Sequence, residues 1–402
     1  MAKSGDSKSQ VLIAGGGIGG LSTGLALARQ GLAATVLERS TFTEESGAGI
    51  QLGPNATRLL AHLGVLEAIE CVAFKPSAIW LFDGLSGKRL AAIPLGAHSE
   101  NRYRAPYLTL HRADLQAALH TACSEAKKVT LKPRFEVGGI TQTGASVRAT
   151  STDGGVAEGP ALIAADGVWS EVRKTVAPNA RLIFAGATAW RTLVPRVGLG
   201  HPFAAPVVGV WLAPNAHLVH YPVRAGSDLN VVAIIEGGAD ARGWNETGDA
   251  AALRSAFTHW CKDSKSLLEA DASWRCWSLY RLAGLNGWSG GRIALLGDAA
   301  HPVLPYLAQG AALAIEDAVV IAETLAECGG DALTAFPLYA ARREARAKTV
   351  AQKSERYGKR YHLSGAMRVA RNLVLHSQSS GQLLGGLDWL YGEPGSKRFG
   401  KN

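Results

Sequence analysis

The first forty residues place two apolar runs on either side of a glycine cluster and an alanine-rich stretch. The apolar runs cover residues 10–14 and 33–38, and the alanine-rich stretch covers about 18–30. Short apolar runs bounded by glycine predict buried strands, and the longer stretch between them predicts a helix. Because a helix can carry the chain back across a sheet, this order predicts two parallel strands.

Helical spacing of apolar residues recurs later in the chain. Residues 53–69 read as one helix that starts at a Pro-Asn pair, and residues 111–126 read as another. The segment 310–327, "GAALAIEDAVVIAETLAE", gives the strongest helical pattern.

Strand-like runs dominate from about residue 180 to 236, among them "HLVHYPV" and "LNVVAIIE". Turns are expected at Pro214-Asn215 and at Ala225-Gly226-Ser227. A buried strand then returns in the segment 291–301 and ends at Gly297-Asp298. We therefore expect an α/β fold whose first domain draws on the start, middle and end of the chain, with a sheet-based α+β domain inserted.

Length and composition agree with a two-domain globular protein. The chain has 402 residues, of which 47% are hydrophobic and 19% are charged. The net charge of +9 alone would allow nucleic acid or an anionic surface as partner. The basic residues are densest in 342–360, where they alternate with acids as on an exposed helix, and no nucleic-acid motif accompanies them. We expect a solvated basic surface and no nucleic-acid partner.

The cysteines and the amino terminus indicate a soluble cytoplasmic protein. The five cysteines are scattered and form no CxxC pair, so we expect neither disulfides nor a metal site. The segment "MAKSGDSKSQ" is polar, and no uncharged apolar stretch is long enough to span a bilayer. We expect no membrane association.

Gly15, Gly17 and Gly20 form a GxGxxG motif between the first strand and the first helix. The first glycine permits a tight turn, the second lets the backbone approach a pyrophosphate, and the third lets helix and strand pack closely. Glu38 ends the next strand, about twenty residues on, where a carboxylate accepts hydrogen bonds from ribose hydroxyls. A carboxylate there would repel a 2′-phosphate, so the motif predicts FAD or NAD rather than NADP.

Two further segments carry carboxylates after apolar runs. Asp166 lies in "ALIAADGVWSEVRKTV", where it either caps a helix or contacts a cofactor. Asp298 closes a buried strand, where a carboxylate needs a partner such as a ribityl hydroxyl. Gly310 and Ala311 open the next helix, whose amino terminus could stabilise negative charge on a reduced flavin.

The motifs "GGGIGG", "ADGVWSEVR" and "GDAAHPVLPYLAQGAALAIEDA", in this order and spacing, resemble those of the single-component FAD-dependent aromatic hydroxylases with the p-hydroxybenzoate hydroxylase fold. The resemblance runs over essentially the whole chain, through "DWLYGEP" near the carboxyl terminus. Within that group the chain is most similar in look to salicylate hydroxylases, 3-hydroxybenzoate 6-hydroxylases and 6-hydroxynicotinate 3-monooxygenases.

The resemblance implies a Rossmann-like FAD-binding domain, an inserted sheet domain for the substrate and a carboxyl-terminal helical segment. We expect the first from residues 1–75, 105–180 and 285–330, the second from 76–104 and 181–284, and the third from 331–402. Relatives of this kind are often monomers or homodimers.

The resemblance also implies the chemistry and the cofactor site. NADH or NADPH reduces FAD, O2 adds to give a C4a-hydroperoxyflavin, and one oxygen atom passes to an electron-rich aromatic ring. The residues expected at FAD are Gly15, Gly17, Gly19, Gly20, Glu38, Arg39, Gln51, Arg112, Asp166, Asp298, Gly310 and Ala311. The expected partner is a small aromatic substrate that carries a carboxylate.

Hydroxylation of a phenol is helped by a base that removes the hydroxyl proton. Strand alternation in "HLVHYPV" puts His217 and Tyr221 on one face and His220 on the other. Taken alone, the pattern favours His217 as an ordinary hydrogen-bonded core histidine. The resemblance favours His217 as base or substrate anchor and Tyr221 as its hydrogen-bonding partner.

Other substrate residues carry over less completely. Gln51 and Tyr306 stand where 6-hydroxynicotinate enzymes have histidines, and Pro305 stands where 3-hydroxybenzoate 6-hydroxylases have glutamine. We expect Pro305 and Tyr306 to border the flavin. Arg191 could meet a substrate carboxylate or lie in a surface or flavin loop.

Two other activities stay open at this point. The same fold could hydroxylate or epoxidise a larger ring of the quinolone or polyketide type. An oxygen-independent flavin dehydrogenase is the alternative from another class.

Overall fold

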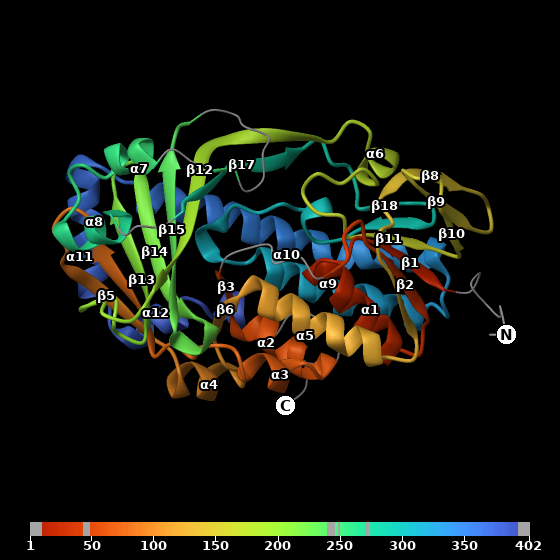
Figure 1. Cartoon of the computed structure of the whole chain (residues 1–402), viewed down its shortest axis with the longest axis horizontal. Coiled ribbons are helices and arrows are strands. Elements are labelled where there is room, and N and C mark those ends of the chain that lie inside the picture. Colours follow the sequence, from red (N-terminus) through yellow and green to blue (C-terminus); the bar gives the residue numbers. More distant parts are fainter. Residues whose placement is uncertain (1–9, 43–48, 239–245, 248–249, 270–272, 393–402) are drawn as a thin grey trace.

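The computed structural model describes residues 10–42, 49–238, 246–247, 250–269 and 273–392. The polar segment 1–9 and the last two residues of "DWLYGEP" lie outside the described residues. Two large sheets lie toward opposite ends of the molecule, and two long strands, β12 (Arg181–Pro195) and β17 (Arg275–Ala283), run along one edge between them (Figure 1).

A six-stranded sheet forms the centre of the first domain. Its order is β18–β19–β11–β1–β2–β7, and every pair of neighbours is parallel except β18 and β19. The strands are β1 (Val11–Ala14), β2 (Ala34–Leu37), β7 (Val129–Lys132), β11 (Leu162–Ala164), β18 (Ser289–Gly290) and β19 (Ile293–Leu295). Helix α1 (Ile18–Arg29) joins β1 to β2, so the predicted parallel strand–helix–strand unit is confirmed.

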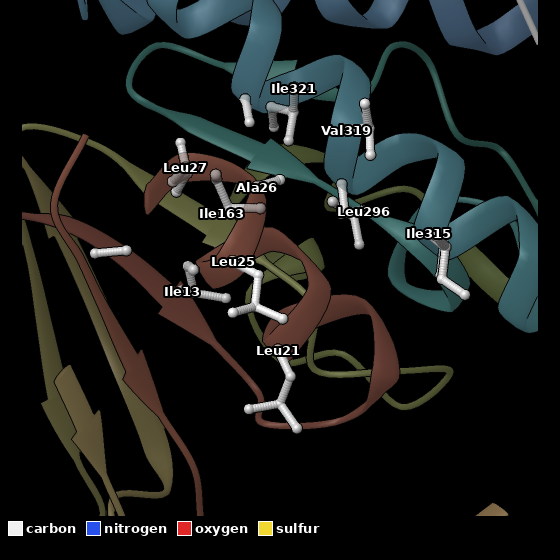
Figure 2. Packing of buried hydrophobic residues seen from close by; sticks show 14 of the residues in the cluster. Ile13, Leu21, Leu25, Ala26, Leu27, Ile163, Leu296, Ile315, Val319 and Ile321 are labelled. Atoms are coloured by element: carbon white, nitrogen blue, oxygen red, sulfur yellow. The ribbon is translucent and has the colours of Figure 1, made fainter. Parts of the chain in front are cut away.

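The core of this domain lies where α1 meets α9 (Gly310–Glu327). Leu21 and Leu25 of α1 and Ile315 and Val319 of α9 belong to one cluster of buried hydrophobic residues (Figure 2). Helix α5 (Arg112–Glu125) also packs on α1. The bounds of α9 agree with the predicted helix. A long, unbroken helical repeat of apolar residues makes the first and last residues of a helix easy to predict.

The prediction of a single helix over residues 53–69 is wrong, because this segment forms two helices. Residues 53–69 form α2 (Pro54–Leu63) and α3 (Leu66–Glu70), and Gly64 between them has a φ of 77°. A residue in this left-handed conformation cannot continue a right-handed helix, so α2 ends there.

The second large sheet has eight strands in the order β16–β17–β12–β15–β14–β13–β4–β5. Its remaining strands are β4 (Ala78–Asp83), β5 (Arg89–Pro94), β13 (Val207–Ala213), β14 (Ala216–Val223), β15 (Asp228–Glu236) and β16 (Glu246–Thr247). Both predicted turns are confirmed, because β13 and β14 are joined at residues 214–215 and β14 and β15 at 224–227. All eight strands fall within 76–104 and 181–284; the domain borders themselves stay a prediction.

Smaller elements complete the fold. A two-stranded sheet pairs β3 (Gly49–Leu52) with β6 (Leu108–His111), and a three-stranded sheet contains β8 (Val137–Gln142), β9 (Val147–Ser151) and β10 (Val156–Gly159). The short helices are α4 (Ala97–Tyr103), α6 (Arg173–Val176), α7 (Ala250–Ala256), α8 (Lys262–Glu269), η2 (Arg224–Gly226), η3 (Gly297–Ala299) and η4 (Pro305–Leu307). The carboxyl-terminal part contains α10 (Ala332–Tyr361), α11 (Gly365–Ser377), α12 (Ser380–Gly385) and α13 (Asp388–Tyr391).

The basic segment 342–360 belongs to α10, and one of its faces is buried, which the expected solvated helix did not include. The side chain of Arg343 is 2% exposed and lies 2.7 Å from Asp317 and 2.8 Å from Glu316. Arg346 lies 2.6 Å from Glu316. These cations therefore neutralise two buried acids of α9 rather than facing solvent.

Among the described residues, no helix combines the length and apolar character needed to cross a bilayer. The same residues contain no group of histidine, cysteine or acidic side chains arranged to hold a metal ion.

Candidate active site

In the glycine turn between β1 and α1, some glycines are required by close packing and one faces open space. A Cβ at Gly15, where φ is 100°, would lie 2.4 Å from the Ala165 carbonyl oxygen, and one at Gly20 would lie 1.8 Å from that of Gly15. A Cβ at Gly17 would meet nothing within 4 Å. Gly17 is therefore the glycine of this turn that leaves room for a ligand at the amino terminus of α1.

The other residues predicted around this turn fall in different surroundings. Glu38 accepts hydrogen bonds from the backbone nitrogens of Gly16 at 2.5 Å and Ser40 at 2.9 Å, which holds its carboxylate beside the glycine turn. Arg39 is exposed. Gly19 serves packing, because a Cβ there would lie 2.9 Å from the side chain of Leu296.

Asp166 holds the turn before α6 with one carboxylate oxygen and leaves the other oxygen without a partner among the described residues. Its Oδ2 accepts from the backbone nitrogens of Glu171 at 3.0 Å and Val172 at 3.2 Å, just before α6. Its Oδ1 is buried and has no hydrogen-bond partner within the described part of the chain. Burial raises the pKa of this carboxyl group. An unpaired buried oxygen is costly, so this atom suits a ligand hydroxyl or amide donor.

Arg173 joins the Asp166 turn to the Asp298 turn. Its buried guanidinium donates to the carbonyl oxygens of Val168 at 2.7 Å and Ala299 at 3.1 Å. Two motifs more than a hundred residues apart are thereby held together.

Asp298 and Arg112 lie near each other at this junction. The side chain of Asp298 is exposed just beyond the end of the buried strand, yet the groups around it still withdraw it from water enough to raise the pKa of its carboxyl group. The strand β19 ends at Leu295, and the turn of η3 carries Asp298 out of the core. Burial lowers the pKa of Arg112, and the Asp298 carboxylate opposes that fall.

The amino terminus of α9 is fixed from inside the protein. Gln309, which precedes the helix, is buried and accepts a hydrogen bond from Asn55 at 3.0 Å. Gly310 and Ala311, the first residues of α9, are half-buried. A Cβ at Gly310 would lie 3.9 Å from Oδ1 of Asp298, so the helix start and this carboxylate face each other.

These features fit FAD. An anionic dinucleotide with a polyhydroxyl chain requires hydrogen-bond donors, acceptors and space. These are available here at Gly17, at the unpaired oxygen of Asp166, at the cation of Arg112 and at the amino terminus of α9. That each of these residues contacts FAD stays a prediction.

A cavity of about 590 Å³ opens beside η4. Its walls come mainly from β13, β14, η4, α10, α11 and α12, and most of the lining is apolar. The predicted residues Gln51, His217, Pro305 and Tyr306 all line it. Gln51, predicted at the cofactor, accepts a hydrogen bond at 2.6 Å from the hydroxyl of Tyr107, which lines the same cavity.

His217 is 1% exposed and is held between aromatic rings. The ring centroids of Tyr306 and Tyr361 lie 5.4 Å and 5.3 Å from its own. Its Nδ1 lies 2.8 Å from Nε2 of His362, and Nδ1 of His362 lies 2.6 Å from a carboxylate oxygen of Glu236. Burial lowers the pKa of His217 well below its ordinary value, and the neighbouring His362 adds to this.

Tyr221 is not the hydrogen-bonding partner of His217. Four residues along a strand correspond to roughly 13 Å, so the two side chains share a face without meeting. Tyr221 instead packs against Gly49, where a Cβ would lie 2.6 Å from its ring, and burial raises its pKa. His220, on the opposite face as predicted, contacts the ring of Phe203 at 5.0 Å.

Arg191 is buried but does not line the cavity. Its guanidinium lies 5.0 Å from the ring centroid of Trp277, and burial lowers its pKa to about 10. The structure therefore keeps Arg191 away from the cavity, whose cationic lining residues are Arg360 and Arg371.

Sequence reasoning missed Asn55, Glu236, His362 and Arg371. Asn55, Glu236 and His362 meet their partners through contacts between distant segments, whereas Arg371 bonds to nearby residues of α10 and α11. None of the four belongs to a local motif. The only available signal was the polar Asn55 at the start of a helix, which reads equally well as a turn residue.

The comparisons with known proteins agree with this arrangement. A family model described as an FAD binding domain matches residues 8–354. A 3-hydroxybenzoate 6-hydroxylase of Polaromonas naphthalenivorans (strain CJ2) is 35% identical over 95% of each chain. The 3-amino-4-hydroxybenzoate 2-monooxygenase PtnB3 of Streptomyces platensis is 35% identical over 96% of each.

Among solved structures, Klebsiella pneumoniae HpxO complexed with FAD and uric acid aligns with a TM-score of 0.84 and 25% identity, covering 96% of this chain and 97% of that one. The matched fold, the matched length and the cofactor site lead to one conclusion: the chain belongs to the FAD-dependent aromatic hydroxylases, which are flavin monooxygenases.

Proposed function

We propose that this enzyme uses NAD(P)H and O2 to hydroxylate a small aromatic acid that carries a phenolic hydroxyl. The observation that carries the proposal is a buried histidine, His217, in the wall of a mainly apolar cavity. The named relatives that act on hydroxybenzoates support the substrate class. Bound FAD, once reduced, would activate O2 so that one oxygen atom passes to the ring.

The hydrogen bonds of His217 leave one ring nitrogen for the substrate. The carboxylate of Glu236 only accepts, so Nδ1 of neutral His362 carries the proton and Nε2 of His362 accepts from Nδ1 of His217. Nε2 of His217 is then the acceptor. A phenol placed against it can pass on its proton, which raises the electron density at the ring carbons to be hydroxylated.

Arg371 supplies a candidate anchor for the substrate carboxylate. This half-buried residue of α11 lines the cavity. Its hydrogen bonds go to the carbonyl oxygens of Arg360 and Tyr361 and to the side chain of Asn372, none of which is an anion. Burial lowers its pKa, and a bound carboxylate would offset that cost.

A second candidate is a larger ring substrate, and the size of the cavity favours it. A volume of about 590 Å³ falls within the ~300–1,000 Å³ typical of sites for drug-sized ligands and exceeds what one benzoate fills. The apolar wall continues from Tyr306 to Met367 and Val374 of α11. A hydroxylase or epoxidase of a quinolone or polyketide ring would use this extra length.

The test is a graded panel of substrates with the FAD-loaded enzyme. Hydroxybenzoates, hydroxypyridine carboxylates and bicyclic phenols are compared for stimulation of NADH and NADPH oxidation, with O2 uptake and product mass measured in parallel. The proposal expects one oxygen atom from O2 in the product of a single-ring acid. Conversion of the bicyclic compounds alone would favour the larger-ring candidate, and oxidation without oxygen incorporation would contradict both in favour of a dehydrogenase.

A further inference from the structure

Three side chains from separate elements form a continuous hydrogen-bonded line that begins at the cavity. His217 of β14 lines the cavity, His362 follows the end of α10, and Glu236 ends β15. The two links measure 2.8 Å and 2.6 Å. Both links are short hydrogen bonds, so each can carry a proton.

The exposure of the line changes from one end to the other. The side chain of His217 is buried and that of His362 is 3% exposed, whereas that of Glu236 is 47% exposed. The line therefore connects the buried wall of the cavity to solvent at Glu236.

The line is not held together by a strong ion pair. Burial lowers the pKa of both histidines, so neither ring gains the charge that would make a strong ion pair with Glu236. Burying two polar rings is costly unless their hydrogen bonds are satisfied. An oriented pair of neutral imidazoles that ends on a carboxylate is, in contrast, what proton transfer over this distance requires.

We propose that His217, His362 and Glu236 form a proton relay that carries the phenolic proton of the substrate from the cavity to solvent at Glu236. The proposal rests on the proposed function, because it needs a phenol at Nε2 of His217. His362 and Glu236 are positioning and relay residues in this scheme, since only His217 reaches the substrate.

The proton steps balance. The substrate O–H bond breaks and its proton joins Nε2 of His217, while the proton on Nδ1 of His217 moves to Nε2 of His362. The proton on Nδ1 of His362 moves to the carboxylate of Glu236, which releases it to water. The substrate becomes a phenolate, and the reverse movement returns a proton to its oxygen after the ring regains aromaticity.

The titratable groups around the relay are few. The hydroxyl-bearing rings of Tyr306 from η4 and Tyr361 from α10 face His217, and burial raises the pKa of Tyr306 to about 12. Arg371 of α11 acts on His362 by its charge. Glu355 of α10, like Glu236, acts on Tyr306 by its charge, but its ion pair is with Arg281 at 3.8 Å.

The relay is tested with oxidised, FAD-loaded enzyme and no NAD(P)H, so that no turnover is needed. The probe is 3-hydroxy-4-nitrobenzoate, whose phenolate is coloured, mixed in a stopped-flow instrument below the pKa of the free phenol. The variants are Glu236→Gln and His362→Gln, and Glu355→Gln is the matched control for the loss of one negative charge.

The relay predicts that both variants bind the probe with unchanged Kd but form phenolate at least about tenfold more slowly, whereas the control behaves as wild type. Added imidazole should restore the rate in the Glu236→Gln enzyme, because a small base can accept the proton at the solvent end of the line, where the Glu236 carboxylate otherwise accepts it. If the His362→Gln enzyme fails to retain FAD, the Glu236→Gln enzyme still tests the relay, because Glu236 is half-exposed and its replacement leaves the core unchanged.

Wild-type rates in Glu236→Gln, or slowing that imidazole does not restore, would overturn the relay and leave the proposed function intact. A wild-type enzyme that binds the probe only as the neutral phenol would overturn the role of His217 in the proposed function, and the relay with it.

Discussion

The amide nitrogen of Asn55 donates a hydrogen bond to the side chain of Gln309 at 3.0 Å, which ties α2 to the residue before α9. The same nitrogen donates to Glu316 at 2.8 Å. All three side chains are buried. Asn55 therefore fixes the start of α9, where the flavin is expected, against the ion cluster within that helix.

Replacing Asn55 by leucine should destabilise the protein and weaken FAD binding. Glu316 and Gln309 would each lose a donor inside the protein, and an unsatisfied buried group costs about 1–3 kcal/mol. We expect the free energy of unfolding to fall by about that amount, measured by urea denaturation, with a several-fold higher Kd for FAD. Asn101→Leu, at an exposed position of α4, is the control. Equal stability of the two variants would contradict the role assigned to Asn55.

Replacing His217 by alanine should depress hydroxylation and leave FAD bound. Loss of a positioned base typically lowers kcat by about 10²–10⁴-fold. The measurement is product formation under saturating substrate, with the flavin absorbance spectrum recorded on the same sample. His220→Leu, on the same strand but the opposite face, tests for damage to the sheet. Unchanged kcat in the His217 variant would exclude it as the base, and loss of FAD would mark it as structural.

Replacing Arg371 by glutamine should raise KM for carboxylated substrates. The guanidinium would no longer face the carboxylate, and a charge-assisted hydrogen bond is worth about 1.5–3 kcal/mol, which is roughly 10- to 150-fold in KM. The same variant should treat the carboxamide analogue of the substrate almost as wild type does. If KM rises equally for the carboxylate and the carboxamide, Arg371 supports the wall of the cavity and does not bind the carboxylate.

The buried cluster around Asp317 should make stability depend on pH in acid. Burial alone would raise the pKa of Asp317, but the charges of His301 and Arg343 hold the folded-state value at about 2. The unfolded value is about 3.9. Because the folded pKa is the lower one, Asp317 stabilises the fold fully above the unfolded pKa, and this contribution is lost as the pH falls from about 4 to about 2.

Urea denaturation across that pH range checks the assignment. Asp317→Asn should cost about 3–5 kcal/mol near neutral pH, because it leaves the cation of Arg343 poorly compensated inside the protein. Its free energy of unfolding should also fall less steeply between about pH 4 and 2 than that of wild type. Parallel curves for the two proteins would show that other carboxylates govern acid stability.

The sequence predicted well what is encoded locally. The strand–helix–strand unit around Gly15 and the helix that begins at Gly310 follow from periodicity and glycine chemistry within a few residues. The break at Gly64 was missed because nothing in the local pattern shows that its φ is positive. The burial of Arg343 was missed because its partners lie on another helix.

The candidate site was predictable to the same extent. The cofactor motifs can be recognised in the sequence, and His217 was found because strand alternation and a family motif both indicate it. Its true partner, His362, lies 145 residues away and belongs to no motif. The relay arises because the end of a 30-residue helix reaches the sheet, and only the packed fold specifies that meeting.

Two glycines of one motif should fail in different ways when replaced by alanine. A Cβ at Gly17 meets nothing within 4 Å, so Gly17→Ala should leave the stability of the FAD-free protein unchanged. It should raise the Kd for FAD by about tenfold or more, because the methyl group enters the space where the pyrophosphate is expected.

A Cβ at Gly20 would lie 1.8 Å from the carbonyl oxygen of Gly15, so Gly20→Ala should destabilise even the FAD-free protein, by about 1–3 kcal/mol. Urea denaturation of the FAD-free proteins and titration with FAD separate the two effects. If Gly17→Ala bound FAD as wild type does, the cofactor would have to lie elsewhere than against the start of α1, and the roles given to Glu38 and Asp166 would fall together.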